Sequence, residues 1–119
     1  MENYEKLYTD FLTLYKTGMC SGEEIGEIIV RLAHCYAKAN LDMITKERSM
    51  NLVARETEGQ TDVNGKAISS TKAKVFVDAT SECFSYNVAR GHLQNIEAYI
   101  NALKSLQKGV LNEFSHLSN

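Results

Sequence analysis

Residues 69–117 read SSTKAKVFVDATSECFSYNVARGHLQNIEAYINALKSLQKGVLNEFSHL, and this stretch decides the fold. Its apolar residues recur at intervals near three and four, which is the spacing of one face of a helix. Sustained over so many turns, the pattern predicts a single long helix with a coiled-coil-like seam. The seam consists of Phe76, Ala79, Cys83, Tyr86, Leu93, Ile96, Ile100, Leu103, Val110, Phe114 and Leu117.

Turn signals divide the chain upstream of this helix. Gly18 suits the position just after a helix end, and Ser21 with Glu24 forms an S-x-x-E capping box that opens the next helix. The polar stretch 59–68 predicts a loop, in which Asn64 and Gly65 can adopt positive φ; its flanks do not alternate as the strands of a β-hairpin would. Ser69 or Ser70 follows as a helix N-cap. The predicted helices are therefore 2–17, 22–58 and 69–117.

The predicted fold class is all-α, with the whole chain 1–119 forming one helical domain. A short N-terminal helix packs on a long antiparallel helical hairpin, and homo-oligomerisation completes the helical bundle. If residues 57 and 72 face each other across the loop, Tyr36 lies near Leu93 and Ile25 near Leu103.

An oligomer is predicted because helix 2–17 reaches only to about residue 35 along its neighbour. The distal arm, 36–58 with 71–93, is left with two helices and carries apolar residues away from the seam. The end of the last helix, 108–117, is also left uncovered; the alternative is that this helix bends or ends near Gly109. The apolar residues of the arm are Ile44, Leu52, Val75, Phe84 and Val88.

Composition narrows the class of function. The 119 residues contain no proline, and 13 Lys and Arg against 15 Asp and Glu give a net charge of −2, which disfavours a general nucleic-acid binder. The cysteines, 3 in number, are widely spaced and predict no disulfide framework. The chain lacks a signal-like N-terminus and an apolar run that could cross a membrane, so we expect a cytoplasmic protein with no membrane partner.

Two polar clusters are candidate ligand-binding sites. Arg48, Asn51 and Arg55 share one face of helix 22–58, and the expected register brings Lys74, Asp78 and Ser81 near them. Two guanidinium groups with an amide suit a phosphate or pyrophosphate. The alternative is that Arg55 and Arg48 pair with Asp78 and Glu82 across the hairpin.

The second cluster interrupts the predicted seam. Arg90, like Lys46 on helix 22–58, occupies a seam position where an apolar residue is expected. Arg90 and Asn87 can bind an anionic ligand whose aromatic ring stacks on Tyr86 or Tyr36. The alternatives are that these polar positions set the register of the helices or extend to solvent.

Catalysis and metal binding are not predicted. The histidines are scattered, and the chain has no Gly-rich phosphate loop, no HExxH and no paired carboxylates. We therefore expect a protein that is not an enzyme, with no cofactor and no metal.

The segment KAISSTKAKVFVDATSECFSYNVARGHLQNIEAYINALKSLQKGVLNEF, preceded by the polar loop and the helices described, resembles small helical proteins of tailed bacteriophages and prophages. Two groups are similar: helical-bundle counter-defence "sponge" proteins that sequester nucleotide immune signals, and UvsY-like recombination mediators that bind single-stranded DNA. The first resemblance implies capture of an ADP-ribose or cyclic-nucleotide signal to inhibit host antiviral defence. The second implies a basic surface, but residues 38–90 carry nearly balanced charge.

The functional hypothesis is a non-enzymatic, phage-type homo-oligomer that binds a small nucleotide-derived anion between the two long helices or between protomers. Arg48, Arg55, Lys74 and Arg90 would neutralise phosphates, Tyr86 or Tyr36 would stack on a base, and Asn51 and Asn87 would orient the ligand. The alternatives are a single-stranded-DNA-binding recombination mediator and a helical protein-interaction module.

Overall fold

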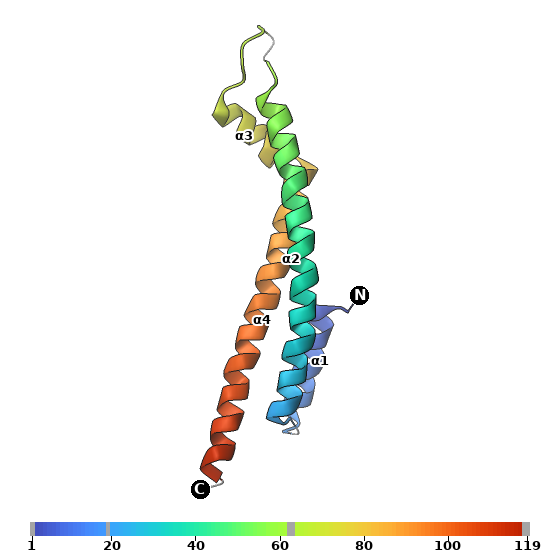
Figure 1. The fold of residues 1–119 in the computed structure, drawn as a ribbon, viewed down its shortest axis with the longest axis vertical. Helices are drawn as coiled ribbons and strands as arrows, with labels where there is room; N and C mark the ends of the chain where they lie inside the picture. The colour runs from blue at the N-terminus through green and yellow to red at the C-terminus, as the bar shows by residue number, and fades with distance from the viewer. Residues whose placement is uncertain (1, 19, 62–63, 118–119) are drawn as a thin grey trace. The chain divides into compact units, whose positions relative to one another are not determined.

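The structure is a computed structural model that describes residues 2–18, 20–61 and 64–117, with side chains described as far as residue 112. Four helices follow one another in these ranges: α1 (Tyr4–Lys16), α2 (Gly22–Glu58), α3 (Ser70–Asp78) and α4 (Ser81–Leu117) (Figure 1). Strand-like pairing in the described residues is limited to one antiparallel bridge, between Thr61 and Ala67. The prediction of an all-α protein is confirmed.

The chain forms two compact units, and α2 and α4 contribute to both. Unit 1 comprises residues 1–38 and 94–119, and unit 2 comprises residues 39–93. The sequence predicted one domain, and the division follows from the length of α1. This helix has 13 residues, so only the first part of α2 gains a third helix to pack against.

The predicted turn signals act as expected at three helix ends. Gly18 has φ +75°, and its backbone N–H donates to the carbonyl oxygen of Tyr15 at 3.0 Å, closing α1. The Glu24 N–H donates to Ser21 Oγ at 3.2 Å and opens α2. The Lys72 N–H donates to Ser69 Oγ at 3.2 Å and opens α3.

The predicted continuous helix 69–117 is divided in the structure, and the break lies at Ala79 and Thr80. The Thr80 hydroxyl donates to the Val77 carbonyl oxygen at 2.6 Å and accepts from the Cys83 N–H at 3.2 Å, so it ends α3 and caps α4. The apolar period continues through this point, which is why periodicity alone predicted one helix. By contrast, α4 continues through Gly109, so the predicted alternative end at that residue is wrong.

Unit 1 has a three-helix core. Phe11 of α1, Leu32 of α2 and Leu103 of α4 are all buried, and Tyr8 stacks on Tyr99 with ring centroids 4.1 Å apart. The largest fully buried side chains are those of Ile25, Leu32, Ile96 and Leu103, and the last two lie on the predicted seam of helix 69–117.

Two glycines of α2 lie against side chains of α4 in unit 1. A Cβ added at Gly22 would lie 3.1 Å from Leu111 Cδ2, and one added at Gly26 would lie 3.1 Å from Gln107 Nε2. Gln107 Nε2 also donates to the Gly22 carbonyl oxygen at 3.0 Å. Gly26 therefore faces a residue about one helical turn beyond the predicted register. The predicted register was counted along one unbroken helix after the loop. Because α3 and α4 are separate helices, that count does not hold for α4.

Unit 2 has a sparse core of mostly small side chains. Ala73, Cys83 and Ala89 are buried, whereas Phe76, placed on the seam by the sequence, is 48% exposed. Phe84 is 70% exposed. All the apolar residues predicted to lie away from the seam are indeed exposed: Ile44, Leu52, Val75, Phe84 and Val88.

Candidate ligand-binding site

Arg48, Asn51 and Arg55 line one shallow hollow of about 380 Å³ on α2 in unit 2. Their spacing of three and four residues brings the side chains to one side of the helix, as predicted. We call this hollow the arginine groove. Its lining residues are Ile44, Glu47, Arg48, Asn51, Leu52 and Arg55.

The guanidinium groups of the arginine groove form no ion pair within the described residues. Ion pairs among the described residues join Lys6 to Asp10 and Arg31 to Glu2, both outside the groove. The structure therefore lacks the alternative pairs of Arg48 and Arg55 with Asp78 and Glu82. Both arginines are exposed, so their donors are available to an anion from solution.

The other members of the first predicted cluster lie elsewhere in unit 2. Lys74 is exposed on α3 and does not line the arginine groove. Ser81 lines a different hollow of about 230 Å³, together with Lys46 and Ser49. The polar seam position Lys46 thus faces a polar surface, to which Glu82 and Ser85 also belong.

The second cluster is partly assembled. The Arg90 guanidinium lies 6.0 Å from the centroid of the Tyr86 ring, and Asn87 Nδ2 donates to Cys83 Sγ at 3.7 Å. Arg90 itself is exposed, and its neighbour Ala89 takes the buried seam position. The interruption of the seam inferred at Arg90 is therefore wrong: Cys83 and Leu93 of the predicted seam are buried, and between them the inward position is that of Ala89.

Tyr36 belongs to unit 1, whereas Tyr86, Asn87 and Arg90 belong to unit 2. Tyr36 is half-buried and lines a groove of about 310 Å³ between α2 and α4. Its neighbours there include Glu97 and Lys104, whose opposite charges do not select an anion.

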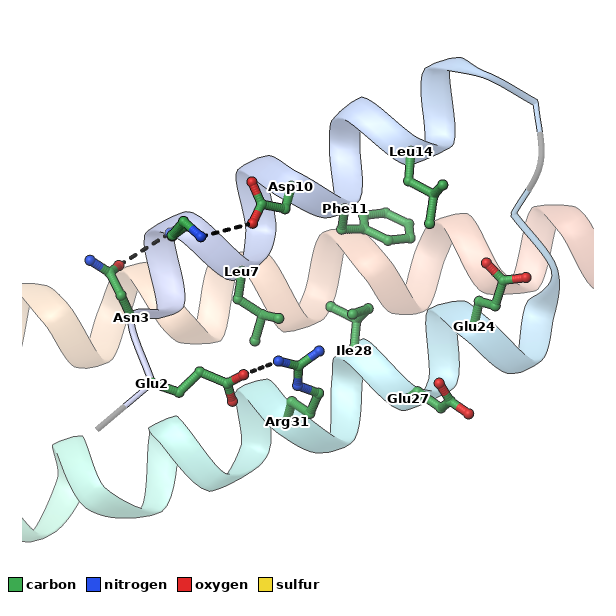
Figure 2. A pocket seen from close by; sticks show the side chains of 11 residues that line it. Glu2, Asn3, Leu7, Asp10, Phe11, Leu14, Glu24, Glu27, Ile28 and Arg31 are labelled. Atoms are coloured by element: carbon green, nitrogen blue, oxygen red, sulfur yellow. Dashed lines mark hydrogen bonds and ion pairs between the residues drawn. The ribbon is translucent and has the colours of Figure 1, made fainter.

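Sequence reasoning missed a hollow of about 340 Å³ between α1 and α2. Figure 2 shows Leu7, Phe11 and Ile28 between the two helices, with Glu24 and Glu27 along α2. Glu2 is ion-paired with Arg31 at one end. Acidic groups outnumber basic ones in this hollow, which makes it unsuitable for a phosphate. Acidic residues do stand beside apolar ones in both helices, as in Asp10–Phe11 and Glu27–Ile28, but this pattern does not indicate that two helices enclose a hollow.

The cysteine environments do not suggest a nucleophile. Burial raises the pKa of the Cys35 thiol, and the nearby Glu2 carboxylate raises it further. Burial likewise raises the pKa of the Cys20 thiol, with a smaller contribution from Glu24. A reactive cysteine needs a lowered pKa, so these thiols stay protonated at neutral pH.

Neither a metal site nor a membrane span is found where the chain is described. No group of three or more His, Cys, Asp or Glu side chains in these ranges is arranged to hold a metal ion. No helix there is both long and apolar enough to cross a membrane.

In a comparison with known proteins, no protein-family model, curated protein or solved structure matches this chain.

Proposed function

We propose that the protein is a non-catalytic binding protein whose arginine groove captures a small, phosphate-bearing ligand of the nucleotide type. The observation that carries this proposal is the grouping of Arg48, Asn51 and Arg55 in one hollow without an ion pair to either arginine among the described residues. A planar guanidinium binds two phosphate oxygens at once, and the amide of Asn51 adds a directional donor.

Apolar side chains beside the arginines favour a ligand that carries a base or sugar in addition to its phosphate. Ile44 and Leu52 also line the arginine groove and are 50% and 52% exposed. They offer a surface against which a base or sugar can pack while the arginines hold the phosphates. The resemblance to sponge proteins supports the same ligand class, and sequestration of a nucleotide immune signal is the biological role we propose.

We also propose that the protein acts as a homo-oligomer in which α2 and α4 form an antiparallel hairpin completed by a second copy. The support comes from unit 2, where seven large apolar residues on three helices are at least 40% exposed. Large apolar side chains exposed in such number on one unit favour an interaction site. These residues are Leu41, Ile44, Leu52, Val75, Phe76, Phe84 and Val88.

The test is isothermal titration of the full chain with ADP-ribose and with inorganic pyrophosphate. We expect Arg48→Ala and Arg55→Ala each to weaken binding about tenfold or more, because each removes a charge-assisted hydrogen-bonding group. Arg48→Lys retains the positive charge but loses the planar guanidinium, so its affinity for the ligand should lie between those of Arg48→Ala and the wild type. Arg31→Ala is the matched control, since Arg31 lies on the same helix but in unit 1. Equal loss in Arg31→Ala, or no binding by the wild-type chain, would refute the proposal.

The exposed apolar residues also favour a second candidate, a helical protein-interaction module. This candidate predicts no binding of either small molecule and a loss of partner binding in Phe84→Asp. A single-stranded-DNA-binding mediator would instead show affinity that rises with strand length and falls steeply with salt.

A further inference from the structure

The arginine groove contains one carboxylate, and this group restricts what the groove can bind. Glu47 is half-buried and lines the hollow together with Arg48 and Arg55. Neither arginine forms an ion pair with Glu47 within the described part of the chain. An ionised carboxylate accepts hydrogen bonds and donates none, and it repels a simple anion such as phosphate. A ligand that suits the whole groove therefore carries hydrogen-bond donors as well as negative charge.

The lining residues follow a chemical order along α2. Ile44 stands at one end, Glu47 follows three residues later, and Arg55 stands at the other end, eight residues beyond Glu47. These steps correspond to about 4.5 Å and about 12 Å along the helix axis. Arg48 and Asn51 lie between Glu47 and Arg55. The order is thus apolar, then acidic, then basic, with an amide among the basic groups.

The turn of the helix places the opposite charges on different sides of the hollow. Consecutive residues project about 100° apart, so Glu47 borders one side and Arg48 the other, with Ile44 and Arg55 between them. A long side chain on a helix leans toward the N-terminal end, which brings the Arg55 guanidinium closer to the level of Glu47. Leu52 borders the Arg48 side, where it can cover the methylene groups of the arginines. A ligand lying along the groove therefore has a carboxylate beside its middle and cations beside one end.

A ribonucleoside diphosphate carries its chemical groups in the same order: a flat base, a ribose with two adjacent hydroxyls, and then the phosphates. A carboxylate that accepts from a ribose hydroxyl recurs in nucleotide-binding sites. We infer that Glu47 is a specificity-determining residue of the arginine groove. Its carboxylate accepts hydrogen bonds from the ribose 2′- and 3′-hydroxyls of a ribonucleoside diphosphate, with the base against Ile44 and the phosphates at Arg48 and Arg55. This inference rests on the proposed function and specifies its ligand class.

The first test compares three ligands by isothermal titration of the full chain: ADP, 2′-deoxy-ADP and inorganic pyrophosphate. We expect ADP to bind about tenfold more tightly than 2′-deoxy-ADP, because the missing hydroxyl deprives a carboxylate of a hydrogen bond. Equal affinities for ADP and 2′-deoxy-ADP, with pyrophosphate also bound, would overturn this inference and leave the proposed function standing. An absence of binding by all three ligands would overturn the proposed function itself.

The second test distinguishes a hydrogen-bonding carboxylate from a negative charge that only repels. Glu47→Gln keeps the size of the side chain and removes its charge. This variant should bind ADP about fivefold more weakly, because it loses charge-assisted hydrogen bonds. It should bind pyrophosphate about twofold or more tightly than the wild type, because a repulsion is removed. Tighter binding of both ligands by Glu47→Gln would show that Glu47 only repels anions and would overturn the inference.

A matched control is available on the same helix. Glu56 is exposed on α2 and does not line the arginine groove. Glu56→Gln makes the same change of charge and should alter the affinities for ADP and for pyrophosphate by less than about twofold, since exposed charges outside the site are screened by salt. Far-ultraviolet circular dichroism of both variants checks that the helices are retained. Equal effects of Glu47→Gln and Glu56→Gln would contradict a specific role for Glu47.

Discussion

Replacement of Leu32 by alanine tests the core of unit 1. Leu32 is 0% exposed and lies on α2 among the buried residues of all three helices of the unit. The substitution removes three carbon atoms, which at about 0.8 kcal/mol per buried methylene gives about 2.4 kcal/mol. The cavity left behind adds to this loss, so the expected fall in unfolding free energy is between about 2.5 and 5 kcal/mol.

The assay is urea denaturation followed by far-ultraviolet circular dichroism, with the slope of the transition compared between variants. Val30→Ala is the control, because Val30 lies on the same helix and is 59% exposed. This variant should change the unfolding free energy by no more than about 0.5 kcal/mol. A loss below about 1 kcal/mol for Leu32→Ala, or equal losses for the two variants, would refute the described packing of α2.

Three further predictions concern the helices. Gly91→Ala should stabilise the chain by about 0.5–1 kcal/mol, because a Cβ there meets nothing within 4 Å. Gly26→Val should destabilise the chain by about 1–3 kcal/mol through the contact with Gln107. Thermal unfolding measures both changes, and a change of the same sign in the two variants would contradict the described glycine environments. Thr80→Ala should cost about 1 kcal/mol through loss of the α4 cap, with Thr80→Ser close to wild type; a neutral Thr80→Ala would place the start of α4 elsewhere. Burial raises the pKa of the Tyr4 phenol above its ordinary value of 10.0. The folded state therefore keeps this proton to a higher pH than the unfolded state, and the unfolding free energy falls as pH rises above about 10. In denaturation series between about pH 9 and 11, the unfolding free energy of Tyr4→Phe should fall less than that of the wild type.

The fold class and most helix ends follow from local signals in the sequence. Gly18, the Ser21 capping box and Ser69 each act through backbone groups within a few residues, so the sequence alone locates these ends. The exposed apolar residues of the distal arm were also predictable, because a short α1 cannot cover the whole of α2. The break at Thr80 was missed because apolar residues keep their helical period on both sides of it, and a capping hydroxyl competes with helix continuation only through local geometry.

The candidate site was predictable only where one helix forms it. Arg48, Asn51 and Arg55 share a face through spacing along α2, which the sequence states directly. The contribution of Lys74 depended on the register between helices, which the break before α4 changes. The inward position of Arg90 was inferred from the apolar period along one helix, and the buried residue there is Ala89. The hollow between α1 and α2 depended on how two helices pack, which periodicity does not specify.

Anion binding by the arginine groove can be observed residue by residue in a titration of the isotopically labelled chain with inorganic pyrophosphate, followed by ¹H–¹⁵N nuclear magnetic resonance. We predict that the largest shifts fall on backbone amides between residues 44 and 55 and on the Nε–H signals of Arg48 and Arg55. Shifts centred on α1 or on the groove beside Tyr36, with the signals of Arg48 and Arg55 unchanged, would show that the anion does not bind in the arginine groove.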